Sequence, residues 1–166
     1  SFRQVDGLSF SSAYDMFTLV ISDLYKKHLY LLESEHVNSF DKKIFERIVG
    51  GEASEKEIKG SLLLLTGMMQ AHYGKPVILL IDEYDVPVAK ANSNGYYQEM
   101  QEIMKGLMQA LKDNPALRLA VITGCLKIAK ESIFTGLNNF KVMSILDARF
   151  DEQFGFTDNE VKKILD

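Results

Sequence analysis

The feature that most constrains the fold is an apolar run, Val77 to Ile81, which two acidic residues, Asp82 and Glu83, follow directly. The run shows no alternation with polar residues, and Gly74-Lys75-Pro76 precedes it. A short continuous apolar run is typical of a strand that is buried on both faces. Such strands occur in parallel sheets covered by helices, so we expect an α/β fold with this segment as a central strand.

A second apolar run completes a strand, helix, strand unit. This run covers residues 117–122 and is apolar except for Arg118, and Asn114-Pro115 precedes it. Between the two runs, a polar stretch at 92–95 predicts a loop. Apolar side chains at three- and four-residue steps then predict a helix through Tyr96, Met100, Ile103, Leu107 and Leu111. A crossover of this length is usual between parallel strands, and we expect a third short strand at 142–146.

The rest of the chain is predicted to be mostly helical. Four helices follow from periodicity and end signals: one from near Ser12 to Leu31, one over 40–48 that stops at Gly50-Gly51, one behind a capping box at Ser54 to Glu57 that ends at Gly74, and one behind a capping box at Thr157 to Glu160. Glycine suits the helix ends because it adopts the left-handed conformation without steric cost.

Composition limits the class of protein. The chain has 166 residues, of which 46% are hydrophobic and 25% charged, with a net charge of −4 and a single cysteine, Cys125. We expect one domain over 1–166 with a core of its own, and no internal disulfide. No apolar run approaches the roughly 18 residues of a membrane span, and the first residues lack the features of a signal peptide. A cytoplasmic protein without a membrane partner is therefore expected.

The two acids after the first strand are the strongest functional signal. In open α/β sheets, ligands bind beyond the carboxyl ends of the strands, so an acid that follows a strand is held at such a site by a rigid element. This pattern predicts a Walker B segment, with Asp82 as the magnesium ligand and Glu83 as the catalytic base that orients and deprotonates a water. The alternative is a buried strand that meets a polar loop.

A threonine leaves the second strand at the same edge of the predicted sheet. Thr123 precedes Gly124 and stands where a sensor hydroxyl would contact a γ-phosphate or the attacking water. A threonine that satisfies a turn is the alternative. Residues 116–149 carry five basic and two acidic side chains, a local charge of +3 that includes Lys127 and Lys130. A positive edge beside an acidic magnesium site suits a polyphosphate.

The sequence lacks one part that a nucleotide hydrolase needs. It contains no Gly-x-x-x-x-Gly-Lys-Ser/Thr loop, whose backbone N–H groups cradle phosphates. The pair Gly74-Lys75 precedes a strand instead of opening a helix, so we interpret it as a helix stop. The chain also begins without methionine. We therefore expect a domain truncated at its N-terminus, with no phosphate-cradling residues of its own.

Other chemistries have weaker support in the sequence. The three histidines, His28, His36 and His72, lack the spacing of a zinc site. Cys125 is interpreted as a buried thiol that packs as a small hydrophobe. Asp82, Glu83 and Asp85 could form the carboxylate cluster of a nuclease, but that role would leave Thr123 unexplained.

Seven segments together suggest a family. They are residues 75–87, Gly95-Tyr-Tyr, 111–115, Val121-Ile-Thr-Gly, 130–139, Ser144-Ile-Leu-Asp and Phe154-Gly-Phe-Thr. As a set they resemble the predicted AAA-ATPase-like family of bacterial and archaeal proteins, over nearly the whole chain. The resemblance implies a parallel-sheet, three-layer P-loop NTPase-like fold that lacks its N-terminal P-loop strand and helix. It also implies that the helix from about 157 leads into a further region.

The same resemblance has implications for cofactors and partners. Mg²⁺ and ATP are implied for the intact protein, with neither expected on this chain alone. The family tends to have arginine where this chain has Lys127, which keeps the charge but loses the planar fork that binds phosphate. Many members continue into a domain similar to restriction-endonuclease-like nucleases. Without the P-loop strand, segment 142–146 either pairs beside the second strand or remains an exposed edge that another copy covers.

Two functions remain open at this level. The first is part of an ATP-binding and ATP-hydrolysing domain, inactive without an upstream P-loop, with Asp82, Glu83, Thr123 and Lys127 as its site residues. The second is a signalling or scaffold module whose nucleotide state switches a surface that binds a protein partner. Nucleic-acid binding is disfavoured by the net charge of −4 and by the lack of interleaved basic and aromatic residues.

Overall fold

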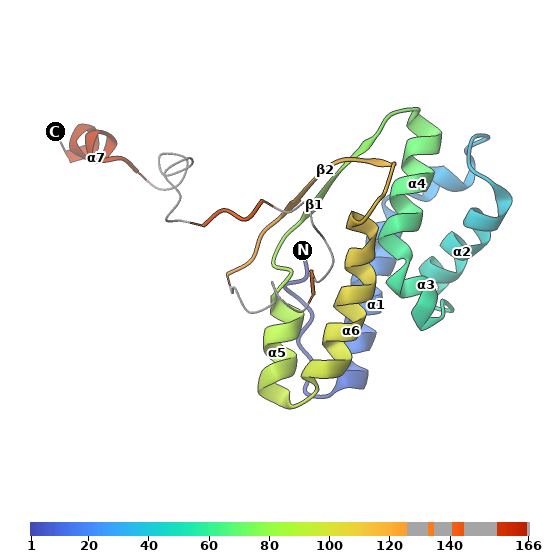
Figure 1. The fold of residues 1–166 in the computed structure, drawn as a ribbon, viewed down its shortest axis with the longest axis horizontal. Helices are drawn as coiled ribbons and strands as arrows, with labels where there is room; N and C mark the ends of the chain where they lie inside the picture. Colours follow the sequence, from blue (N-terminus) through green and yellow to red (C-terminus); the bar gives the residue numbers. More distant parts are fainter. Residues whose placement is uncertain (126–132, 135–140, 145–155, 166) are drawn as a thin grey trace. The chain divides into compact units, whose positions relative to one another are not determined.

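The computed structural model describes residues 1–125, 133–134, 141–144 and 156–165 (Figure 1). The chain divides into two compact units, Ser1–Gly136 and Leu137–Asp166. The first unit combines helices with a small parallel sheet, which agrees with the expected α/β class. None of the helices in these described ranges has both the length and the apolar character to cross a lipid bilayer.

The sheet in the described part of the chain has two strands, β1 (Val77–Ile81) and β2 (Leu117–Ile122). They run parallel, and Ile81 pairs with Ile122 at their carboxyl ends. At the other end, the Val77 N–H donates to the Ala116 carbonyl at 2.8 Å. Both predicted strands are therefore confirmed, and their carboxyl ends lie side by side, as Figure 1 shows.

Three helical segments connect β1 to β2: α5 (Val86–Asn94), α6 (Tyr97–Met108) and the short 3-10 helix η2 (Gln109–Leu111). The predicted loop at 92–95 is wrong, because α5 continues to Asn94 and Gly95, at φ +83°, is its C-cap. The Asn94 side-chain amide donates to the Lys90 carbonyl at 3.0 Å and to the distant Gly7 carbonyl at 3.4 Å. These bonds stabilise a helix end whose composition is typical of a loop.

α1 (Phe10–Lys26) differs from its prediction at both ends. It starts before Ser12, because Ser9 is the N-cap and its Oγ accepts from the Ser12 N–H at 3.3 Å. It ends at Lys26, so the predicted continuation to Leu31 is wrong. The chain instead forms a 3-10 helix, η1 (Leu29–Leu32), which buries Leu31 completely and so extends the apolar pattern past the true helix end.

Three helices follow: α2 (Ser39–Gly50), α3 (Glu55–Lys59) and α4 (Ser61–Tyr73). The predicted glycine stops are confirmed, with Gly51 at φ +75° and Gly74 at φ +63°. The capping box of α3 is also confirmed: Ser54 Oγ accepts from the Glu57 N–H, and the Glu57 carboxylate accepts from the Ser54 N–H at 2.9 Å. The one helix predicted behind it is two helices, which meet at Gly60.

The hydrophobic core of the first unit lies among these helices. Its largest fully buried side chains include Phe17 and Tyr25 of α1, Phe45 of α2 and Leu107 of α6. The Tyr25 hydroxyl donates to the Ser61 carbonyl at 2.6 Å and thereby satisfies a polar group inside the core. Burial also raises the pKa of Tyr25 above its ordinary value.

The predicted burial of β1 on both faces is wrong for the described residues. Ile81 belongs to the core and Leu79 packs against it, whereas Ile78 is 53% and Leu80 is 71% exposed. Leu119 and Val121 of β2 are likewise exposed. Successive side chains of a strand point to opposite faces, so burial of the second face requires a second layer, and the described residues supply none there.

The second unit contains α7 (Asp158–Leu165). Its predicted capping box is confirmed, because the Glu160 carboxylate accepts from the Thr157 N–H at 2.8 Å and Thr157 Oγ1 accepts from the Glu160 N–H. The predicted third strand is wrong for residues 142–144, which are neither strand nor helix. A strand needs a partner for its backbone groups, and the sheet of the described residues contains only β1 and β2. Residues 145–146 lie outside the described residues.

Candidate functional site

The candidate site is the edge of the sheet where β1 and β2 end. Asp82 follows β1 and Thr123 follows β2, and the Thr123 N–H donates to the Ile81 carbonyl at 2.8 Å. The parallel pairing therefore continues one residue past β2 and brings the two polar residues together. The sequence predicted that both would lie at this edge, since the carboxyl ends of parallel strands meet there.

The side chains of Asp82 and Thr123 are in direct contact. Thr123 Oγ1 donates a hydrogen bond to Asp82 Oδ1, and both residues are exposed to solvent. A hydroxyl that donates to a carboxylate fixes the orientation of that carboxylate. An exposed, oriented carboxylate beside a hydroxyl is a donor set that suits Mg²⁺, which binds through one or two carboxylates and keeps several waters.

Glu83 lies in the turn that follows β1 and has an unusual backbone. Its φ is +56°, in the left-handed region that residues other than glycine rarely adopt. Its Oε2 accepts a hydrogen bond from the Ser1 hydroxyl at 2.8 Å. Conformations of this kind cost about 1–3 kcal/mol and tend to occur at functional sites, where the surrounding structure holds them.

The N-terminal segment also reaches this edge, which the sequence analysis did not predict. The Phe2 N–H donates to the Asp82 carbonyl at 3.1 Å, and the buried Phe2 ring stacks on Phe17 of α1 with centroids 5.4 Å apart. Val5, farther along the segment, is buried as well. The apolar residues Phe2 and Val5 were the only signal in the sequence that this segment packs against the core.

The turn after β1 and the exit from β2 are joined by further contacts. The Tyr84 N–H donates to the Thr123 carbonyl at 3.2 Å, and Asp85 Oδ2 accepts from the Cys125 N–H at 3.0 Å. Asp85 is only 4% exposed. In the sequence, Asp85 is a possible member of a nuclease cluster, and no pattern predicts this contact. The predicted burial of Cys125 is wrong: the residue is exposed, because it lies beyond the end of β2.

The remaining predicted site residue, Lys127, lies outside the described residues, as does Lys130. The basic stretch 116–149 therefore stays a prediction. In the described ranges, no group of three or more histidine, cysteine, aspartate or glutamate side chains is arranged to hold a metal ion.

Two of the three histidines lie in a separate aromatic cluster. The ring of Tyr30 lies between those of His28 and His72, with centroid distances of 5.8 and 5.3 Å. The Tyr73 hydroxyl donates to the Tyr30 hydroxyl at 2.9 Å, and burial together with this bond raises the pKa of Tyr30 to about 12. The cluster joins η1 to the end of α4, before β1 begins, so its place in the fold differs from that of the acidic pair.

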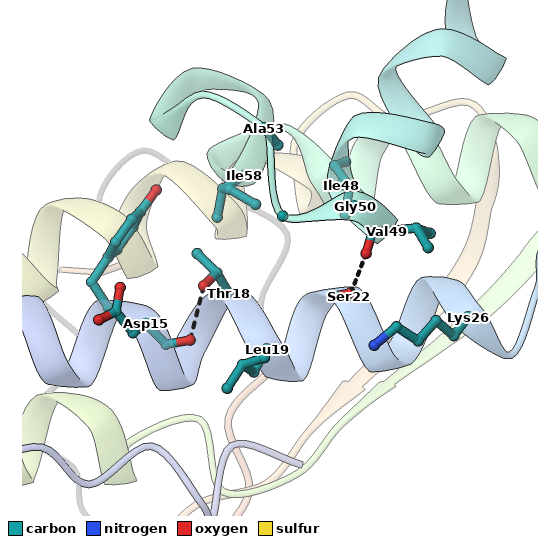
Figure 2. Close-up of a pocket in the computed structure, with 12 residues that line it drawn as sticks. Asp15, Thr18, Leu19, Ser22, Lys26, Ile48, Val49, Gly50, Ala53 and Ile58 are labelled. Atoms are coloured by element: carbon teal, nitrogen blue, oxygen red, sulfur yellow. Dashed lines mark hydrogen bonds between the residues drawn. The ribbon is translucent and has the colours of Figure 1, made fainter.

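A surface hollow of about 280 Å³ lies between α1 and the connection from α2 to α3 (Figure 2). Figure 2 shows that two of its hydroxyls are already bonded to backbone carbonyls: Thr18 Oγ1 donates to Asp15 at 2.8 Å, and Ser22 Oγ donates to Val49 at 3.1 Å. None of the residues that line the hollow belongs to the strand ends. The hollow is therefore a separate feature.

Comparison with known proteins places the chain in a family. Residues 3–134 match the model of the AAA-ATPase-like family, which is described as a predicted AAA-ATPase. The chain belongs to this family. The AAA-ATPase-like match includes β1, β2, Asp82, Glu83 and Thr123, whereas Ser1 and Phe2, which contact this site, precede the matched residues.

The chain also resembles part of a longer curated protein. A protein of Azotobacter chroococcum mcd 1, described as an uncharacterized protein in the vnfD 5′ region, is 29% identical over 123 residues. The aligned part is 73% of this chain and 24% of that protein, so the chain spans about a quarter of the relative's length. No solved structure matches the chain.

Proposed function

We propose that the chain is part of an ATP-binding and ATP-hydrolysing domain, with its reaction centre at the carboxyl ends of β1 and β2. One observation carries the proposal: the Thr123 hydroxyl donates to the carboxylate of Asp82 at the edge where open α/β sheets bind ligands. Membership of the AAA-ATPase-like family supports the same assignment.

Each residue then has a chemical role. The exposed carboxylate of Asp82 would hold Mg²⁺, and the ion would supply charge stabilisation for the phosphates. Thr123 orients Asp82 through its O–H, and as the sensor hydroxyl it accepts from the attacking water through its oxygen. Glu83 orients a water and accepts its proton. Because the Ser1 hydroxyl donates to Oε2 of Glu83, Oε1 remains to accept that proton.

The proposal also covers the fold. A P-loop supplied by a longer protein would complete a three-layer, P-loop NTPase-like domain, and a further layer would cover the face of Ile78 and Leu80. Buried apolar faces on both sides are usual for parallel sheets. The 166-residue chain lacks a sequence that cradles phosphates, so we expect it to bind Mg·ATP poorly when it is isolated.

The first test uses Glu83→Gln in a longer protein that contains this chain together with a P-loop. We expect ATP turnover to fall by about 10²–10⁴-fold while ATP binding persists, because the amide cannot accept the proton. Steady-state phosphate release and a nucleotide-binding titration measure the two effects. Glu102→Gln, at an exposed position of α6, is the matched control and should keep full turnover.

Two results would contradict the proposal. Full turnover by Glu83→Gln would remove its role as the base. The alternative, a module whose nucleotide state only switches a protein partner, instead predicts that Glu83→Gln keeps its partner binding. Micromolar binding of Mg·ATP to the isolated chain, measured by calorimetry, would show that the chain does not need a separate P-loop.

A further inference from the structure

A buried aspartate next to the candidate site has an unusual hydrogen-bond partner. Asp85 occupies the N-cap position of α5, where aspartate commonly accepts bonds from the first turn of its own helix. Here its side chain makes no capping bond, and Oδ2 accepts instead from the Cys125 N–H on the exit from β2. The carboxylate therefore joins the β1–α5 turn to the residues that follow β2.

Gly124 shows how tightly these two segments are packed. A Cβ atom built at Gly124 would lie 2.6 Å from Asp85 Oδ1 and 2.6 Å from Tyr84 Cε1, distances that real Cβ atoms do not show. The side chains of Asp85 and Tyr84 therefore occupy the space that a Cβ at position 124 would need, and a larger residue there would displace them. The close packing at Gly124 and the hydrogen bond from the Cys125 N–H therefore involve two adjacent residues after β2.

Thr123, which precedes Gly124 and Cys125, also contacts this turn. Its carbonyl accepts from the Tyr84 N–H at 3.2 Å, and its hydroxyl donates to Asp82. Residues 123–125 are thus held along their whole length, and the strained Glu83, at φ +56°, lies inside the turn that holds them. A strained residue persists when its surroundings fix it, which these contacts do.

We propose that Asp85 is a positioning residue that acts through Gly124 and Cys125 to hold the Thr123 hydroxyl on the carboxylate of Asp82. We call these three residues, Asp85, Gly124 and Cys125, the strand-end clasp. The claim that the strand-end clasp supports cation binding by Asp82 rests on the proposed function. The claim that it holds the residues after β2 in place does not. Outer contacts of this kind orient the groups that bind a metal.

The single cysteine makes the clasp measurable. Cys125 is exposed, and only its backbone N–H takes part in the clasp, so a nitroxide on its side chain reports the motion of the β2 exit. We expect Asp85→Ala to sharpen the spin-label spectrum, because the Cys125 N–H loses its acceptor. Asp85→Asn keeps a carbonyl oxygen as acceptor and should retain most of the immobilised spectrum.

A matched control separates the clasp from general loss of stability. Ile48→Ala truncates a buried residue of α2, remote in sequence from the clasp, and should lower the melting temperature without changing the spin-label spectrum. Circular dichroism checks that each variant is folded. An Asp85→Ala spectrum like that of the unsubstituted chain would overturn the clasp, as would an equal sharpening in Ile48→Ala.

A second readout tests the effect on Asp82, with Mn²⁺ alone as the probe. Mn²⁺ bound at Asp82 should attenuate the nitroxide signal, and Asp82→Asn should abolish this effect. We expect Asp85→Ala to weaken Mn²⁺ binding by about tenfold, with Asp85→Asn and Ile48→Ala near the unsubstituted value. Equal Mn²⁺ affinity in Asp85→Ala would overturn the positioning role.

The two readouts distinguish the inference from the proposed function. If neither the unsubstituted chain nor any variant binds Mn²⁺ but Asp85→Ala still makes the label more mobile, the clasp stands and the metal role of Asp82 fails. If Mn²⁺ binds through Asp82 and the label stays immobile in Asp85→Ala, the metal role stands and the clasp fails.

Discussion

At the scale of single residues, the candidate site depends on one hydroxyl. Thr123 contributes both its carbonyl, which accepts from Tyr84, and its hydroxyl, which donates to Asp82. Only the hydroxyl depends on the residue type, because any residue has a carbonyl. The side chain can therefore be changed while the backbone contact is kept.

Substitution of this threonine should alter metal binding more than folding. Thr123→Val removes the donor to Asp82 but keeps the branched shape that suits the end of a strand, so we expect Mn²⁺ binding to weaken by about tenfold. Thr123→Ser keeps the hydroxyl and should bind normally. Electron paramagnetic resonance of free Mn²⁺ gives the affinities. Normal binding by Thr123→Val would show that Asp82 needs no orienting partner.

A second residue, Glu57, should make stability depend on pH. The hydrogen bond from Arg47, with help from the Ser54 N–H, lowers the pKa of Glu57 from 4.5 to about 2. The folded state thus binds the proton less tightly than the unfolded state, so this stabilisation is complete above pH 4.5 and is lost as the pH falls toward 2.

The expected result is a difference between two denaturation series. Urea unfolding of the unsubstituted chain should lose stability between pH 4.5 and 2 more steeply than that of Glu57→Gln, which cannot ionise. Added salt should reduce the difference, because the Arg47 to Glu57 pair is partly exposed. Parallel pH profiles for the two chains would show that Glu57 contributes no such effect.

At the scale of elements, glycines end helices for different reasons. Gly51 closes α2 at φ +75°, a conformation in which other residues are strained. Gly60 lies between α3 and α4 at φ −84°, and a Cβ there would meet its nearest atom, the Lys56 carbonyl oxygen, at 3.4 Å, an ordinary contact. Only the first position therefore requires glycine.

Alanine at these two positions should have opposite effects. Gly51→Ala forces a Cβ into the left-handed region and should destabilise the fold by about 1–2 kcal/mol. Gly60→Ala restricts the unfolded chain without strain and should stabilise it by about 0.4–1 kcal/mol. Urea denaturation measures both. Destabilisation by Gly60→Ala would mean that the break between α3 and α4 depends on a glycine after all.

At the scale of the whole molecule, the sheet has two faces with different surroundings. One face of β1 packs on the core, and the other exposes Ile78 and Leu80. Apolar patches of this kind on a protein surface usually mark a contact with another structure. Substitutions of the exposed residues on this face should therefore have little effect on the packing of the core.

Two substitutions contrast the exposed face with the core. Leu80→Thr replaces a side chain that is 71% exposed and should change the free energy of unfolding by less than about 0.5 kcal/mol. Leu107→Ala opens a cavity at a residue that is 0% exposed and should cost about 2–5 kcal/mol. Urea titrations of the two variants provide the comparison. A large loss for Leu80→Thr would indicate that this face is covered in solution.

Much of the fold could be predicted, because the responsible interactions are local. The meeting of Asp82 and Thr123 at the candidate site could be predicted as well. The capping boxes of α3 and α7 act within four residues. The strands β1 and β2 follow from local runs that are apolar except for Arg118 in β2. Asp82 and Thr123 could be brought together by reasoning alone, because parallel strands align their carboxyl ends. The prediction at 92–95 failed for the opposite reason: Asn94 bonds to Gly7, which no local pattern reveals.

The sequence by itself thus determined the class of the fold, its family and the identity of the acids at the strand ends. Only the tertiary structure decided which hydrogen bonds hold these residues. The Ser1 hydroxyl donates to Glu83, the Phe2 N–H donates to the Asp82 carbonyl, and the Asp85 carboxylate accepts from the Cys125 N–H. It also decided that one face of the sheet is exposed. The physical reason is the same in each case, because these contacts and this burial depend on segments far apart in the chain, whereas caps, glycine stops and apolar runs act over a few residues.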